Sequence, residues 1–183
     1  MMRKIIYLVA LFLCVGLAAY SVIGTRPTPT SPKSEKREVR EQRRAARQAE
    51  YERLTDSIVL AHAFQFIPQT MQQEIAGPMR MLSNPNFEVG IYDDAADIFL
   101  PYIKGMAPPY HYTILNYTIP GMTDYVTEQT ASGWRVSFTT SLFSASTYTF
   151  IFEINSKYGG ATLNVKNTWN NTVQYTGSIS RYY

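Results

Sequence analysis

The C-terminal half of the chain alternates apolar and polar residues with the two-residue period of a β-strand. The pattern is clearest in four runs: Trp134–Phe138, Tyr148–Ile154, Ala161–Val165 and Val173–Ile179. Turn-forming residues separate these runs, and short loops between alternating strands favour antiparallel hairpins in sequence order, which form a meander.

Weaker alternation continues toward the N-terminus of the same domain. It predicts strands at 70–76, 86–92, 96–103, 111–119 and 122–130, with prolines at strand ends or edges. Eight or nine strands with one apolar face predict an all-β domain over residues 68–183. We expect an antiparallel meander that forms a sandwich or a partly closed barrel.

Helix-forming residues fill most of the segment before this domain. Residues 33–67 are therefore predicted to form a charged helical segment that precedes the strands. Thr55 or Asp56 is a suitable N-cap for its last part. The apolar residues between Ile58 and Ile67 predict that this last part packs on the β domain.

The first residues have the pattern of an export signal. Basic residues precede an uncharged apolar run, Ile5–Ile23, that ends in small residues. Residues 1–24 are predicted to be a signal peptide cleaved after Ser21 or Gly24, with an uncleaved membrane anchor as the alternative. The chain is then exported to the periplasm or cell surface. Membrane contact is expected only through this N-terminal segment, if it remains uncleaved.

A Pro/Thr linker follows at residues 25–32, where repeated prolines favour an extended chain. The single cysteine, Cys14, lies inside the apolar run, so disulfides and thiol catalysis are not expected in the mature chain.

Charge is divided unevenly between the two parts of the chain. Residues 33–67 carry eight basic and six acidic side chains, whereas residues from Pro68 onward carry six basic and eight acidic ones. Basic residues and aromatic residues therefore fall in different parts of the chain, which argues against nucleic-acid binding. The charged segment is either a solvated helix or tether, or a basic surface for anionic lipid or a cell-wall polymer.

The residues that could carry chemistry do not form a recognisable site. His62 and His111 are far apart in sequence and have no cysteine nearby, so neither a metal site nor a cofactor is predicted. Asp93, Asp94 and Asp97 lack the spacing of a calcium loop and predict a solvated hairpin turn.

Three tyrosines are the best candidates for ligand contact. Tyr102, Tyr110 and Tyr112 flank a loop rich in Pro and Gly, and tyrosine rings there can stack on sugars or peptides. The alternative is that they cap the core of the β domain.

These features favour a noncatalytic binding or structural module of the cell envelope whose ligand is unknown. Its expected partner is an envelope glycan, a peptide or a protein. The alternative is a hydrolase acting on envelope glycans or peptides. Such an enzyme would need two of Asp124, Glu128 and Glu153, or an acid and a histidine, in one pocket.

The stretch from Asn84 to Ile179 contains NPNFEVGIYDDAADIFLPYIKGMAPPY (84–110) and the motifs FLPY, YTF and YTGSI in that order. In these residues it resembles domain-of-unknown-function family 4251, a group of exported proteins of Bacteroidota. The resemblance implies an envelope or secreted domain and no known activity. Family members commonly begin with an export or lipoprotein signal. This chain differs there, because Leu13 before Cys14 does not fit a lipid-attachment motif.

Overall fold

A computed structural model of the protein describes residues 32–73, 77–105, 109–143 and 146–182. The predicted signal peptide, with the cleavage candidates Ser21 and Gly24, lies outside these ranges, as does the linker up to residue 31. Among the helical residues that are described, no helix is long and apolar enough to cross a membrane.

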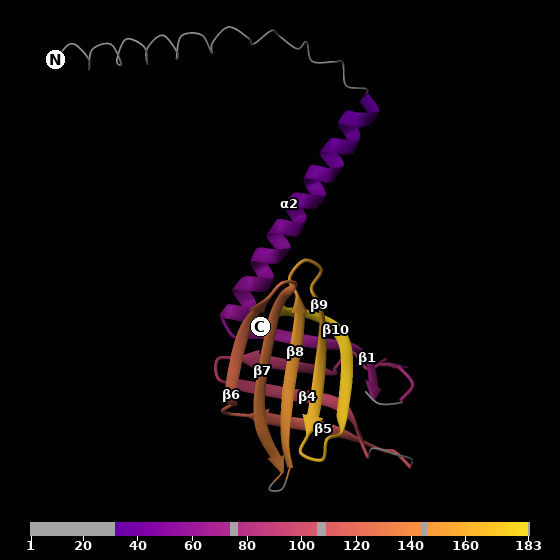
Figure 1. Ribbon diagram of the computed structural model, residues 1–183, viewed down its shortest axis with the longest axis vertical. Helices are drawn as coiled ribbons and strands as arrows, with labels where there is room; N and C mark the ends of the chain where they lie inside the picture. The colour runs from indigo at the N-terminus through magenta and orange to yellow at the C-terminus, as the bar shows by residue number, and fades with distance from the viewer. Residues whose placement is uncertain (1–31, 74–76, 106–108, 144–145, 183) are drawn as a thin grey trace, which may run out of the picture. The chain divides into compact units, whose positions relative to one another are not determined.

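One helix, α2 (Pro32–Leu60), precedes the strands (Figure 1). The chain divides into two units, residues 1–43 and residues 44–183, and the second unit contains the end of α2 together with all the strands. The helix is shorter than the predicted segment 33–67. Thr55 and Asp56 lie inside it and do not cap a separate helix.

Strand β1 replaces the predicted end of the helix. Its two phenylalanines, Phe64 and Phe66, alternate with Gln65 and are fully buried. The chain leaves the helix through His62, which has a left-handed φ of 49°. Residues two apart lie on the same face of a strand, so both rings are buried together. In a helix, residues two apart point in different directions.

Ten strands follow α2. They are β1 (Ala63–Gln73), β2 (Arg80–Met81), β3 (Glu88–Tyr92), β4 (Ala95–Lys104), β5 (His111–Ile119), β6 (Thr123–Thr130), β7 (Gly133–Phe143), β8 (Ser146–Asn155), β9 (Gly160–Asn167) and β10 (Thr172–Arg181). The strand predicted at 70–76 is wrong in its bounds, because β1 starts seven residues earlier and ends at Gln73. The short β2 was not predicted.

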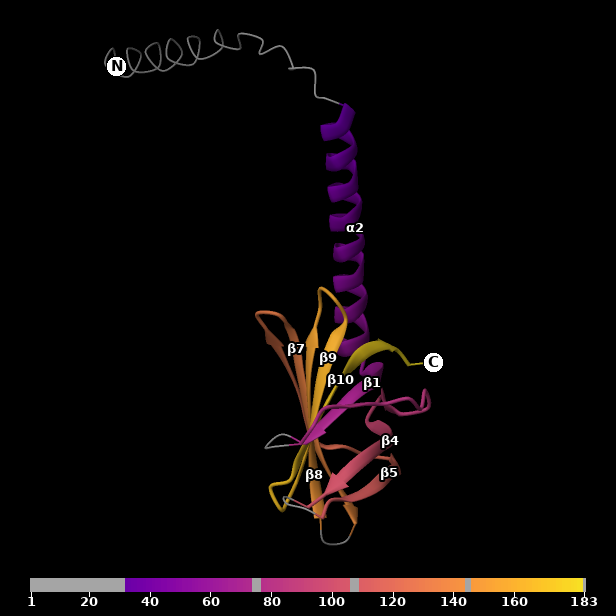
Figure 2. The same cartoon turned by 90° about the vertical axis from the view of Figure 1, so that its right-hand side faces the viewer.

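All ten strands belong to one antiparallel sheet, in the order β5-β4-β3-β1-β10-β9-β8-β7-β6, with β2 paired to β1. The runs β3–β5 and β6–β10 are the predicted meander, and β1 joins them. The sheet curls on itself, so that β6–β10 lie across β1 and β3–β5 (Figures 1 and 2). This curled half-barrel confirms the predicted all-β class with a partly closed barrel.

The core fills the space between the two halves of the curled sheet. Phe152 on β8 is fully buried, and its ring centroid lies 5.6 Å from that of Phe64, 5.8 Å from Phe66 and 6.3 Å from Phe138. The interior is therefore occupied by packed rings contributed by β1, β7 and β8.

The last turns of α2 pack on the β domain. Ile58 and Val59 are buried. Asp56 accepts a hydrogen bond of 2.6 Å from the indole Nε1 of Trp134 and one of 3.3 Å from the hydroxyl of Ser156. One carboxylate oxygen of the helix therefore binds strand β7 and the turn after β8.

Replacing Asp56 with alanine should destabilise this attachment. We expect the free energy of unfolding to fall by about 1–3 kcal/mol, because the partly buried indole N–H loses its acceptor. Urea denaturation followed by tryptophan fluorescence measures the change. Glu50→Ala, an exposed acid on the same helix, is the matched control and should change stability by no more than about 0.5 kcal/mol. Equal effects of the two variants would contradict this role of Asp56.

Candidate functional site: a polar groove on the outer face of the sheet

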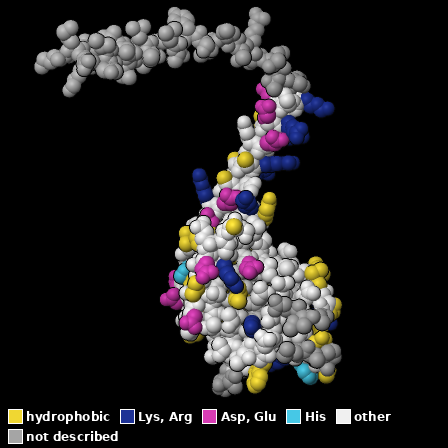
Figure 3. Space-filling view, viewed as in Figure 1, with side chains coloured by type: hydrophobic (Ala, Val, Ile, Leu, Met, Phe, Trp, Pro, Cys, Tyr) yellow, Lys and Arg dark blue, Asp and Glu magenta, His cyan; other side chains and the backbone are white. Residues whose placement is uncertain are grey.

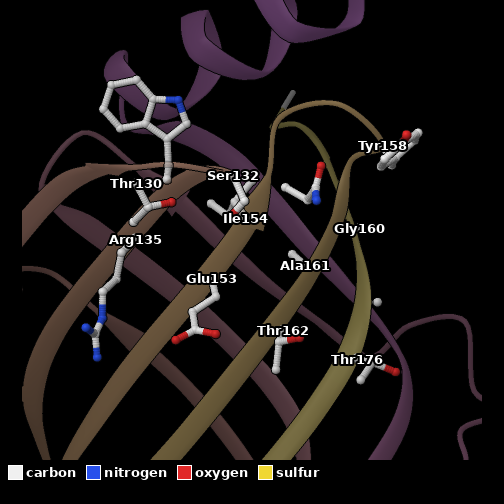
Figure 4. Close-up of a pocket in the computed structure, with 13 residues that line it drawn as sticks. Thr130, Ser132, Arg135, Glu153, Ile154, Tyr158, Gly160, Ala161, Thr162 and Thr176 are labelled. Atoms are coloured by element: carbon white, nitrogen blue, oxygen red, sulfur yellow. The ribbon is translucent and has the colours of Figure 1, made fainter. Parts of the chain in front are cut away.

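The outer face of the sheet carries a row of polar side chains across β7–β10. Arg135 is paired with Glu153 across β7 and β8, Glu153 with Thr162, and Thr162 with Thr176. Directly paired residues on adjacent strands point to the same face. Residues next to them along the strands, such as Phe152, Leu163 and Tyr175, are fully buried, so these four side chains project outward together (Figure 4).

This row lines a hollow of about 640 Å³ that also includes Tyr158 and Gly177. A second hollow of about 320 Å³ continues along the same face, where Asn164 and Lys166 line it. Arg135 and Glu153 line both hollows. We call the two together the outer-face groove.

The groove has three charged side chains, Arg135, Glu153 and Lys166, and the first two line both of its hollows. Arg135 and Glu153 are exposed, and neither side chain forms an ion pair or hydrogen bond with another residue in the described part of the chain. Figure 4 shows the two side chains side by side on neighbouring strands. A planar five-donor cation and an anionic acceptor are therefore both available to a ligand.

An aromatic ring stands at one end of the groove. Tyr158 lies in the turn between β8 and β9 and is 77% exposed (Figure 4). Gly159 allows this turn, because its φ of 62° is left-handed and a Cβ there would overlap the hydroxyl of Tyr51 on α2. Trp134 lies at the same end but is 9% exposed, and Asp56 holds its indole.

The structure places Tyr102, the first of the three predicted tyrosines, inside the core. Its side chain is fully buried, its hydroxyl donates to the carbonyl oxygen of Asn171 at 3.2 Å, and it accepts from the amide of Asn171 at 3.1 Å. Burial raises the pKa of Tyr102 well above its ordinary value. Tyr102 therefore lies in the core of the β domain and not on its surface, which is the position that the alternative interpretation, core capping, describes.

The other two predicted tyrosines lie elsewhere on the surface. Tyr110 is half-buried against the core, and Tyr112 on the edge strand β5 is 51% exposed. The guanidinium carbon of Arg80 is 4.9 Å from the centroid of the Tyr112 ring, within the range of a cation–π interaction. Neither ring lines the outer-face groove, and ligand contact by either stays a prediction.

A separate hollow of about 540 Å³ lies beside the loop that these tyrosines were predicted to flank. Gly105 of that loop, Tyr148 and Trp169 line it. Trp169 is 71% exposed and sits in the turn between β9 and β10. In the sequence, a large aromatic residue among turn-forming asparagines indicates an exposed ring at this position.

The acids considered for hydrolysis do not meet in one pocket. Glu153 lines the outer-face groove, whereas Glu128 faces Arg135 from the edge strand β6 and is not among the groove's lining residues. Asp124 accepts a hydrogen bond from Thr139 at 3.2 Å, near the start of β6.

The remaining candidate residues are also apart from the groove. The ring of His62 lies 4.3 Å from Tyr125, and His111 begins β5. Asp93 and Asp94 form the predicted turn between β3 and β4, and Asp97 accepts from the Tyr182 hydroxyl at 3.2 Å. Among the described residues, no three His, Cys, Asp or Glu side chains are placed to hold a metal ion.

Comparison with known proteins relates the chain to one family. A family model described as a domain of unknown function, DUF4251, matches residues 46–179. No curated protein matches the sequence. The fold is similar to the crystal structure of a DUF4251 family protein from Bacteroides eggerthii, with a TM-score of 0.57 and 13% sequence identity. The similarity covers 73% of this chain and 91% of that one.

At this identity the structural likeness concerns the fold alone. The family model, in contrast, covers most of the chain, from the middle of α2 almost to the end of β10. The predicted resemblance is thereby confirmed, and the chain belongs to the DUF4251 family of domains of unknown function.

Proposed function

We propose that this protein is an exported, noncatalytic binding module of the cell envelope, and that its outer-face groove binds a glycan carrying acidic groups. The observation that carries the proposal is the pair Arg135 and Glu153, exposed side by side in the groove without protein partners. Export to the periplasm or cell surface is part of the proposal and is supported by the signal-like pattern of the N-terminal sequence.

The chemistry of the groove supports an acidic sugar. The guanidinium of Arg135 matches a carboxylate in a bidentate geometry. Glu153, Thr162 and Thr176 supply acceptors and hydroxyl groups for sugar hydroxyls. The exposed ring of Tyr158 offers a flat apolar surface with a polar edge, which suits stacking on a sugar.

The groove does not favour hydrolysis. Glycosidases commonly place two carboxyl groups on either side of the scissile bond. Among the residues that line the outer-face groove, Glu153 is the one carboxylate. We therefore favour binding over the hydrolase alternative.

Isothermal titration calorimetry with trigalacturonic acid and with neutral cellotriose tests this proposal. We expect the acidic trisaccharide to bind more tightly, because it engages Arg135. Arg135→Gln should weaken its binding at least about tenfold, since hydrogen bonds to charged groups contribute roughly 1.5–3 kcal/mol. Arg181→Gln removes an exposed charge at the end of β10, away from the groove, and should leave the affinity unchanged.

Three results would contradict the proposal. They are equal affinity for the two trisaccharides, equal loss in the two variants, and recovery of the protein from the cytoplasmic fraction of its cells. Mass spectrometry of the trisaccharide after incubation tests the noncatalytic part, and shortened products would support the hydrolase instead.

A further inference from the structure

Helix α2 has a face made entirely of basic residues between Lys33 and Arg47. These are Lys33, Lys36, Arg37, Arg40, Arg43, Arg44 and Arg47. At about 100° per residue the seven positions fall within an arc of about 120°. The other eight residues of this stretch contain no lysine or arginine. We call this arc the basic face.

The acidic residues of the same stretch lie outside the basic face. Glu35, Glu38 and Glu41 occupy the remaining arc. Arg37 and Glu41 form an ion pair of 3.1 Å at its border, but their side chains are 82% and 61% exposed. Such exposed pairs contribute little. The near balance of charge along this segment in the sequence therefore conceals a helix that is cationic on one side.

The basic face is exposed to solvent, and this stretch of the helix has no broad apolar face. All seven of its residues are exposed, and Figure 3 shows Lys and Arg side chains projecting from the helix. Val39, 41% exposed, is the one large apolar residue between Lys33 and Arg47. A helix that inserts into a bilayer needs a broad apolar face. Helix α2 is instead suited to lie on a layer of anionic groups, held there by electrostatic attraction.

The sequence before the helix indicates which anionic surface lies within reach. The uncharged run Ile5–Ile23 ends ten residues before Lys33. A fully extended chain of ten residues spans at most about 35 Å. We propose that the basic face of α2 binds the anionic headgroups of the membrane to which residues 5–23 bring the chain. This inference is independent of the proposed glycan groove.

Hydrogen exchange of the full chain in lipid nanodiscs tests the proposal. One set of discs contains phosphatidylcholine alone, and the other contains about 30 mol% phosphatidylglycerol, an anionic lipid. We expect amide exchange in peptides from residues 33–47 to slow at least about tenfold on the anionic discs, because contact with the surface opposes opening of the helix. Peptides from β8 should exchange equally on both. The protection should vanish at about 1 M NaCl, where the Debye length is about 3 Å.

A charge-matched pair of triple variants separates the basic face from overall charge. Lys36→Gln, Arg40→Gln and Arg43→Gln together should abolish the protection, because each basic residue near an anionic surface contributes about fivefold to binding. Arg53→Gln, Lys157→Gln and Arg181→Gln remove three exposed charges elsewhere and should retain it. Each variant is compared with itself on phosphatidylcholine, which corrects for any change in helix stability.

Several outcomes would overturn the proposal. Equal amide exchange of residues 33–47 on the two lipids would overturn it. Equal loss of protection in the two triple variants would also overturn it. Protection on both lipids that depends on protein concentration would instead indicate pairing of the basic face with the acidic side of a second copy. Stronger protection by dissolved polygalacturonate than by anionic discs would indicate an acidic glycan.

Discussion

Replacing Phe152 with alanine should lower the free energy of unfolding by about 3–5 kcal/mol, the usual cost of removing a fully buried phenylalanine. Phe152 touches rings from β1 and β7 as well as lying on β8, so the cavity would open between both halves of the curled sheet. Neighbouring strands fix the surrounding rings, which limits collapse into the cavity. Urea denaturation followed by circular dichroism gives the change in stability.

Trp169→Ala is the control for removal of a large aromatic side chain. Trp169 is 71% exposed and lies in a turn, so its loss should change stability by no more than about 0.5 kcal/mol. If Phe152→Ala cost no more than Trp169→Ala, the packing of β8 against β1 would be wrong.

The strands that carry most of this core could be predicted from the sequence. Residues 148–154 have an apolar residue at every second position, which places Phe150 and Phe152 on one face, although Ile151 is an apolar exception on the other face. The structure buries both. Alternation is informative here because one face of each strand of the meander packs on the core while the other meets solvent.

Strand β1 shows where this reasoning fails. Residues 63–67 follow a strong helical sequence without a glycine or proline between them, and Pro68 interrupts the alternation. The strand is fixed by pairing with β10, more than a hundred residues away, and with β3. The periodicity of a short segment does not indicate which distant strands it will pair with. Here pairing with those strands overrides the helix propensity of the segment.

The candidate site was missed for a related reason. Arg135 and Glu153 are eighteen residues apart and become neighbours only in the register of the β7–β8 hairpin. The predicted tyrosines were chosen for their place beside a loop, which does not indicate whether a ring points inward. The ring of Tyr102 points inward, because buried and less buried residues alternate along β4 and Tyr102 is at a buried position. Its hydrogen-bond partner Asn171 lies in a turn that is distant in sequence. The basic face of α2, in contrast, was readable from helical spacing alone.

Replacing Gly177 with alanine should disrupt the join between the two halves of the sheet. Gly177 on β10 pairs with Pro68 on β1, next to the bulge in β1. A Cβ at this position would overlap the carbonyl oxygen of Ile67 and come within 2.9 Å of Pro68 Cα. Backbone atoms cannot rotate aside as a side chain can. We expect the free energy of unfolding to fall by about 3 kcal/mol, the upper part of the usual cost of overpacking.

Gly160→Ala is the matched control, because Gly160 also lines the outer-face groove but has no atom within 4 Å of an added Cβ. Its stability should stay within about 0.5 kcal/mol of the native value. If the two variants unfolded alike, β1 would not approach β10 closely at this point. Gly177 lines the same groove as Arg135 and Glu153. The close approach that closes the sheet at β1 therefore also shapes one wall of the surface on which the proposed binding function depends.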